Sequence, residues 1–150
     1  NIDASSVATI VGLISICNGI GRVIYGGMFD KFGRSKTMIT VVVVFLVSSI
    51  LLVLAFNTKS LIILIVGFIL CGASYGGVTS VNSAFINLFY GATNYPVNFS
   101  IVNLNLIIAS FGSTIAGMLY DYTGSYISTI FLMIGGIICS FICTICIKRP

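Results

Sequence analysis

Side chains that could carry catalytic or metal chemistry are few in this sequence. Its 150 residues include no histidine, and the only acids are Asp3, Asp30 and Asp121. Acid–base catalysis relies on positioned His, Asp or Glu groups, and zinc sites rely on Cys, His and carboxylate ligands. The sequence therefore argues against an enzyme, and it predicts no catalytic residue and no cofactor.

The five cysteines all lie inside apolar stretches, and Cys139, Cys143 and Cys146 share one helical face. Such spacing would allow a metal cluster. Cysteine in an apolar setting more often behaves as a small hydrophobic side chain, however. We therefore favour packing or lipid contact and predict no metal site.

One cation is distinguished by its position within an apolar stretch. Arg22 ends the segment Asn18-Gly-Ile-Gly-Arg22 and lies eight residues before Asp30, which is about 12 Å along a helix. If this stretch is a membrane-spanning helix, a cation so far from its end usually faces a water-filled cavity or a partner. Arginine suits bidentate contact with a carboxylate. Asn18 lies one turn away on the same face. We predict that Arg22 and Asn18 bind substrate; the alternative is that Arg22 extends along its stem to the interface.

Further polar side chains occur at membrane depth. The ring of Tyr75 could line a cavity and its hydroxyl could bind a polar ligand, with core packing as an equal alternative. Asn82, Asn103 and Asn105 either line the same cavity or form hydrogen bonds between helices. We add Tyr75, Asn103 and Asn105 to the predicted substrate-binding residues.

The composition indicates an all-α integral membrane protein. Hydrophobic residues make up 58%, charged residues 7%, and the mean hydropathy is +1.18, whereas a soluble domain is roughly a quarter charged. Backbone groups in lipid must be satisfied internally, so each apolar stretch is expected to be a helix long enough to cross the membrane. About five transmembrane helices are predicted, over residues 4–29, 37–56, 61–89, 99–120 and 126–147. Turn residues separate them: Gly33, Asn57, Gly91 with Pro96, and Gly124.

The cations predict the orientation. The first break contains Lys31, Arg34 and Lys36, and the C-terminal tail contains Lys148 and Arg149, so five cations share one side. The opposite side carries Lys59 with Asp3 and Asp121. The cation-rich side, including the C-terminus, is therefore predicted to be cytoplasmic. The cations are scattered, which is not typical of a nucleic-acid partner. The sequence begins without methionine or a signal peptide, and we expect that preceding helices are missing.

The first break contains the segment Gly27-Met-Phe-Asp30-Lys31-Phe-Gly33-Arg34-Ser-Lys36. This segment resembles the cytoplasmic loop signature of the major facilitator superfamily. Gly33 permits a tight reversal, and Asp30 is suited to contact the N-terminus of a neighbouring helix, whose dipole favours an anion. We predict a gating role for Gly27, Asp30, Lys31, Gly33 and Arg34; the alternative is a plain basic loop.

The resemblance narrows to the oxalate/formate antiporter family. The segments that resemble its tenth and eleventh helices are Tyr75-Gly-Gly, Ala84-Phe85, Phe89-Tyr-Gly91, Asn94-Tyr95 and Asn98. Gly117-Met-Leu-Tyr120-Asp121-Tyr-Thr-Gly124-Ser125-Tyr126 is similar to its loop between helices eleven and twelve, and the Arg22 segment to its eighth helix. Residues 1–150 are then helices eight to twelve, a partial C-terminal six-helix half of a twelve-helix bundle.

This resemblance implies a plasma-membrane transporter that moves small organic anions by alternating access, through proton symport or exchange. Arg22 matches the family's anion-binding arginine and Tyr75 one of its aromatic residues. The fourth span lacks the family's lysine, and Cys71 stands where the oxalate carrier has a large aromatic residue. One cation fits a monocarboxylate better than oxalate. The expected partners are the anion, the lipid bilayer and the missing N-terminal half.

Two other functions stay open on the sequence. One is a facilitator carrier of another branch, for drugs or sugars, although Arg22 argues against export of cations. The other is a carrier-like membrane receptor that binds a ligand without transporting it.

Overall fold

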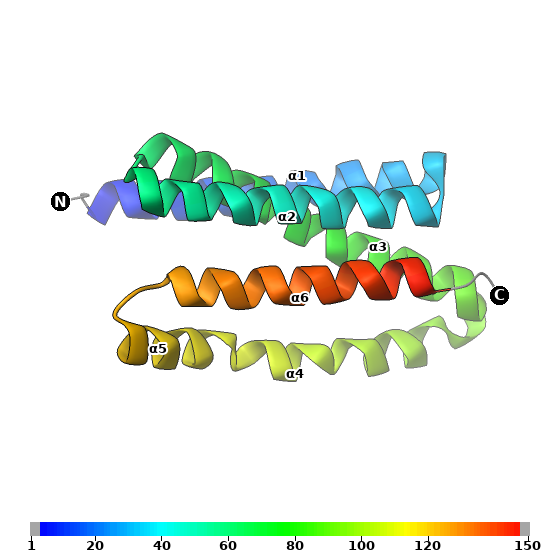
Figure 1. Cartoon of the computed structure of the whole chain (residues 1–150). Coiled ribbons are helices and arrows are strands. Elements are labelled where there is room, and N and C mark those ends of the chain that lie inside the picture. The colour runs from blue at the N-terminus through cyan, green and yellow to red at the C-terminus, as the bar shows by residue number, and fades with distance from the viewer. Residues whose placement is uncertain (1–3, 148–150) are drawn as a thin grey trace.

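The computed structural model describes residues 4–147, and every regular element in that range is a helix (Figure 1). Asp3, Lys148 and Arg149, which entered the orientation argument, lie outside the described residues. The prediction of an all-α membrane fold is confirmed. The helices are α1 (Ala4–Phe32), α2 (Arg34–Thr58), α3 (Leu61–Asn103), α4 (Asn105–Ser110), α5 (Gly112–Thr123) and α6 (Ile127–Cys146).

Four helical runs are long and apolar enough to cross a membrane, and one of them is long enough to cross it twice. The run Leu61–Thr123 has 63 residues, about three times the roughly 20 that a membrane core requires. It reverses at Gly91, whose φ of 70° and ψ of 167° are the only non-helical torsions inside α3. Figure 1 shows α3 running to one end of the molecule and α4 and α5 returning below it. The chain therefore makes five passes, as expected.

The start of the fourth pass differs from the predicted residue 99. Helical structure resumes directly after Gly91, and Pro96 lies inside the second arm of α3. Positive φ is inexpensive only for glycine, so the reversal is confined to Gly91, while Pro96 removes one helical hydrogen bond. Leu104 and Phe111 separate α4 from its neighbours but keep right-handed helical torsions. The fourth pass therefore continues to Thr123.

The other turns between helices are formed by the predicted glycines, with one exception. Gly33 has φ 78° and Gly124 has φ 68°, in agreement with their predicted role. The turn expected at Asn57 is formed instead by Lys59, which takes the left-handed conformation with φ 52° after the last turn of α2. Asn57 itself stays helical.

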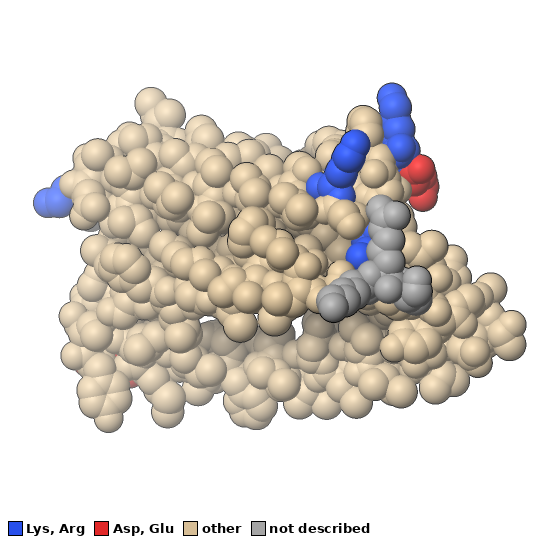
Figure 2. All heavy atoms as spheres, turned by 45° about the vertical axis from the view of Figure 1, so that its right-hand side comes forward, with Lys and Arg blue, Asp and Glu red and all other residues tan. Residues whose placement is uncertain are grey.

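The charges divide between the two ends of the bundle. The turn between α1 and α2, the reversal within α3 and the end of α6 lie together at one end of the bundle (Figure 1), which we call the Gly33 end after the glycine of the first turn. Lys59 and Gly124 mark the opposite Lys59 end. Figure 2 shows Lys and Arg side chains gathered at one end of the molecule, and Lys59, after the last turn of α2, lies at the opposite end. The predicted sharing of one side by the first break, the third break and the C-terminal end of α6 is confirmed.

Close contact between α1 and α3 fixes the geometry on which the site depends. A Cβ added at Gly72 would lie 2.8 Å from the carbonyl oxygen of Ile14, and one at Gly76 would overlap the carbonyl of Asn18. The absence of side chains at these two positions lets the helix backbones touch. Towards the Gly33 end, a core cluster of Tyr25, Phe29, Val41 and Val81 holds α1, α2 and α3 together.

Candidate functional site

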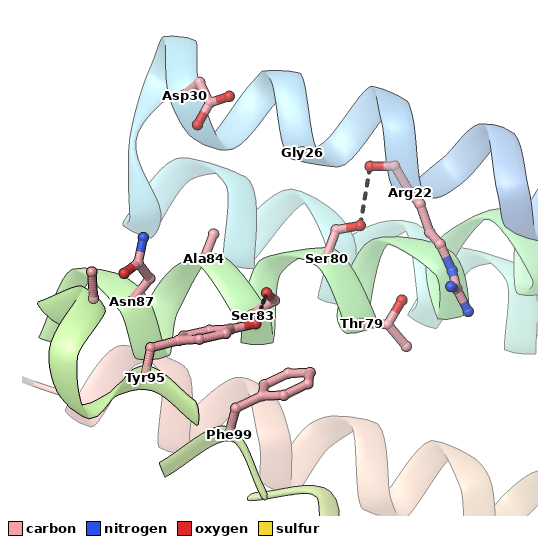
Figure 3. A pocket seen from close by; sticks show the side chains of 11 residues that line it. Arg22, Gly26, Asp30, Thr79, Ser80, Ser83, Ala84, Asn87, Tyr95 and Phe99 are labelled. Carbon is pink, nitrogen blue, oxygen red and sulfur yellow. Dashed lines mark hydrogen bonds between the residues drawn. The ribbon is translucent and has the colours of Figure 1, made fainter. Parts of the chain in front are cut away.

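Two adjoining cavities lie between α1, α3 and the fourth pass. The larger, which we call the Arg22 cavity, has a volume of about 690 Å³ (Figure 3). α1 contributes one wall and the two arms of α3 contribute the others. Its lining residues are Arg22, Gly26, Asp30, Thr79, Ser80, Ser83, Ala84, Asn87, Ala92, Tyr95 and Phe99.

The smaller Tyr75 cavity has a volume of about 400 Å³ and lies further from the Gly33 end. Thr79 and Phe99 line both cavities, so the two spaces meet at these residues. The predicted residues Tyr75, Asn103 and Asn105 are brought together here. The full lining is Tyr75, Val78, Thr79, Asn82, Phe99, Val102, Asn103, Asn105, Leu106, Ile108 and Ala109.

Arg22 is placed in the cavity by a contact between helices. The hydroxyl of Ser80 on α3 donates a hydrogen bond of 3.1 Å to the backbone carbonyl of Arg22 on α1. The Arg22 side chain is exposed, and Figure 3 shows it extending away from Asp30, which lies nearer the Gly33 end. Among residues 4–147 the guanidinium forms no ion pair. It is therefore available to a ligand.

Asn18 does not join Arg22 in either cavity. It lies where α1 packs on α3, with its backbone carbonyl against Gly76. Its side-chain oxygen Oδ1 is buried and finds no partner within the described part of the chain. Close packing at Gly76 thus covers Oδ1 of Asn18, although Asn18 lies only one turn from Arg22.

The residues of the predicted gating motif are separated by the structure. Asp30 lines the Arg22 cavity, whereas the Arg34 guanidinium stacks over the rings of Phe85 and Phe89 at 5.6 and 5.3 Å. Arg34 Nη2 also donates a 3.3 Å hydrogen bond to the carbonyl of Ile147. Arg34 therefore connects the start of α2 to α3 and to the end of α6.

The remaining motif residues are peripheral. The ammonium group of Lys31 lies 5.5 Å from the ring centroid of Phe32, and Gly27 has open space around its Cα. Gly33 supplies the reversal between α1 and α2. Of the motif, only Asp30 faces the site.

Several lining residues were missed by the sequence prediction. Thr79, Ser83 and Asn87 are spaced at i, i+4 and i+8, so they form one polar stripe on α3. That spacing was a usable signal, since residues four apart lie on one helical face. Tyr95 was a different case, because it reaches the site only after the reversal at Gly91, where its hydroxyl lies 2.7 Å from that of Ser83.

The chemistry of the site is recognition by charge and hydrogen bonds. One guanidinium is surrounded by hydroxyl and amide groups, with a single carboxylate towards the Gly33 end. Among the described residues, no group of three or more His, Cys, Asp or Glu side chains could hold a metal ion. Such an arrangement suits reversible binding of a small polar molecule.

Comparison with known proteins gives the family. No curated protein and no solved structure was found to match the chain significantly. The family model of the Major Facilitator Superfamily matches residues 1–150, which agrees with the helical fold, the membrane-spanning runs and a polar cavity between helices. The chain therefore belongs to the Major Facilitator Superfamily of membrane transporters.

Proposed function

We propose that the chain forms part of a secondary carrier that moves small organic anions, monocarboxylates in particular, across the plasma membrane by alternating access. The observation that carries the proposal is Arg22, a cation well inside a membrane-spanning helix that lines a cavity. A cation at such depth is costly without water or a partner. Because no acid pairs with Arg22 among residues 4–147, the carboxylate of a substrate is a natural counter-ion.

The number of charges favours a monoanion over a dianion. Arg22 is the only cation that lines the two cavities, and Asp30 adds a negative charge to the same lining. A second carboxylate on the substrate would have no cation to meet and would be repelled by Asp30. Oxalate is therefore a poorer candidate than lactate, pyruvate or formate.

Alternating access requires more helices than the five passes described. Carriers of this type enclose a midplane site between two helical halves that rock against each other. We propose that this chain supplies helices eight to twelve and that an N-terminal half faces the open side of the Arg22 cavity. Because cytoplasmic loops tend to be rich in Lys and Arg, the cations at the Gly33 end support a cytoplasmic location for that end and for the C-terminus. Asp30 at this end would contact a helix N-terminus of the other half, so that the contact breaks as the halves move.

A sugar carrier is the second candidate, because asparagine side chains line both cavities. Amides suit hydroxyl groups, and Arg22 would then be accessory. A drug carrier and a non-transporting receptor have no specific observation in their favour. Proton symport and exchange are both compatible with the anion-carrier proposal.

Transport by the complete protein in liposomes tests the proposal. Uptake of labelled formate, lactate, pyruvate, oxalate and glucose would be measured for the unmodified protein, for Arg22→Gln and for a control, Lys59→Gln. Lys59 is an exposed cation that lies in neither cavity. We expect saturable uptake of a monocarboxylate that Arg22→Gln abolishes and Lys59→Gln retains.

Other outcomes would redirect the proposal. Monocarboxylate uptake that survives Arg22→Gln would remove Arg22 from the binding site. Uptake of glucose alone would favour the sugar carrier. Saturable binding of an anion without uptake would favour the receptor.

A further inference from the structure

We infer that the substrate carries two or more hydroxyl groups in addition to its carboxylate, as glycerate and the six-carbon sugar acids do. The inference rests on the proposed anion-carrier function and narrows its substrate class. It comes from the neutral part of the cavity lining, which the carboxylate of a substrate would leave unused.

Four asparagines belong to this neutral polar lining. Asn87 lies in the Arg22 cavity, and Asn82, Asn103 and Asn105 lie in the Tyr75 cavity. Among residues 8–147, whose side chains the structure describes, their amide groups form no hydrogen bond. An unpaired amide is costly away from water, so these four groups need water, a ligand or a group of the proposed N-terminal half as their partner.

Two nearby asparagines outside the cavities behave differently. Asn94 and Asn98 donate to the backbone carbonyls of Tyr90 and Asn94, at 3.5 and 2.9 Å. Asparagine in this part of the chain thus forms local hydrogen bonds when no cavity is present. Within residues 8–147, the four cavity asparagines lack such local hydrogen bonds, as do Asn18 and Asn57 outside the cavities, but only these four amides line the space beside Arg22.

Amides and hydroxyls are complementary as ligands. An asparagine side chain offers two donors and an acceptor, and a substrate hydroxyl offers one donor and two acceptor lone pairs. Thr79, Ser80 and Ser83 add hydroxyl oxygens that keep acceptor capacity beyond the hydrogen bonds they already make. An aliphatic monocarboxylate would displace water from these groups and leave them unpaired, which lowers affinity.

The positions of the groups fit one carboxylate flanked by hydroxyls. In Figure 3 the Arg22 side chain reaches toward the level of Thr79, where the two cavities meet. Neutral hydrogen-bonding groups extend from there in both directions, to Asn87 on one side and to Asn103 on the other. A compact molecule with its charge at Arg22 and hydroxyls along its chain would meet both sets.

A graded ligand series tests this on the complete, purified transporter. Isothermal titration calorimetry would compare propionate, lactate and glycerate, which share three carbons and one carboxylate and differ in having zero, one and two hydroxyls. We expect the Kd to fall by about tenfold or more from propionate to glycerate. Gluconate should bind more tightly than propionate, and sorbitol, which lacks a carboxylate, should bind poorly.

The outcomes separate the two proposals. Failure of glycerate and gluconate to bind more tightly than propionate overturns the inference on hydroxyls. If propionate and lactate still bind through Arg22, the anion-carrier proposal stands. Sorbitol binding that equals gluconate binding and is indifferent to Arg22→Gln overturns the anion-carrier proposal itself.

Variants add a second test. Asn82→Leu and Asn103→Leu keep the side-chain size and remove the amide, and each should raise the Kd for glycerate by about tenfold while leaving that for propionate unchanged. Asn57→Leu is the matched control, since Asn57 is exposed near the end of α2 and lies in neither cavity. An equal loss of glycerate and propionate affinity in the cavity variants would overturn the assignment of hydroxyl contacts to these amides.

Discussion

The hydroxyl groups of Ser83 and Tyr95 lie 2.7 Å apart and join the two arms of α3 across the reversal at Gly91. Both residues line the Arg22 cavity, and the Tyr95 ring stacks on Phe99 with centroids 5.2 Å apart. The hydrogen bond therefore fixes the position of one cavity wall relative to another.

Removing either hydroxyl should destabilise this junction. We expect Tyr95→Phe and Ser83→Ala each to lower the free energy of unfolding by about 1 kcal/mol, the usual net contribution of one hydrogen bond. Because the two residues share that bond, the double variant should lose less than the sum of the single losses. Thermal unfolding followed by circular dichroism in detergent measures this. Tyr122→Phe is the control, since Tyr122 is 91% exposed, and additive losses would show that the hydroxyls act independently.

Gly91 and Gly124 both have positive φ but should tolerate different substitutions. Gly91 combines φ 70° with ψ 167°, a region that is essentially restricted to glycine. Gly124, at φ 68° and ψ 7°, lies in the left-handed region that asparagine also visits. We expect Gly91→Asn to destabilise the protein by about 1–3 kcal/mol and Gly124→Asn to have a smaller effect. Equal losses in thermal unfolding would contradict this reading of the two turns.

The passes and turns could be predicted because their causes are local. Apolar stretches of membrane-spanning length and the glycines at positions 33, 91 and 124 determine where helices run and reverse. The start of the fourth pass could not be placed, because Pro96 is an ambiguous signal. It ends many helices, and here it lies inside one.

Residues of the candidate site could be proposed from the sequence only where a residue is unusual in its own helix. Arg22 is conspicuous within an apolar stretch, and Tyr75, Asn103 and Asn105 are polar or aromatic at membrane depth. Asn18 lies outside both cavities, and the sequence did not show this, because the covering of its Oδ1 depends on where Gly76 of α3 packs. Tyr95 was missed because its contact with Ser83 depends on the relative direction of the two arms, which no local pattern encodes.

The close contact at Gly76 gives a stability prediction. A methyl group there would overlap the carbonyl of Asn18, and separating the two backbones would disturb the contact that positions Arg22. We expect Gly76→Ala to cost about 1–3 kcal/mol, as overpacking of a tight interface does. Gly135→Ala is the control, because a Cβ at Gly135 would meet nothing within 4 Å. Thermal unfolding in detergent distinguishes the two, and comparable stability would show that the helices can move apart freely.

Arg34 should be irreplaceable by lysine, although both are cations. Its planar guanidinium stacks over Phe85 and Phe89 while Nη2 donates to the carbonyl of Ile147. Lysine carries a compact, strongly hydrated charge that cannot make the stacked contact and the directed hydrogen bond together. We therefore expect Arg34→Lys to increase amide hydrogen exchange in the last turns of α6, measured by mass spectrometry in detergent. Lys36→Arg, at an exposed position two residues away, should leave exchange there unchanged. If amide protection in α6 survives Arg34→Lys, then α6 is held by its packing on α2, and the contacts of Arg34 do not stabilise it.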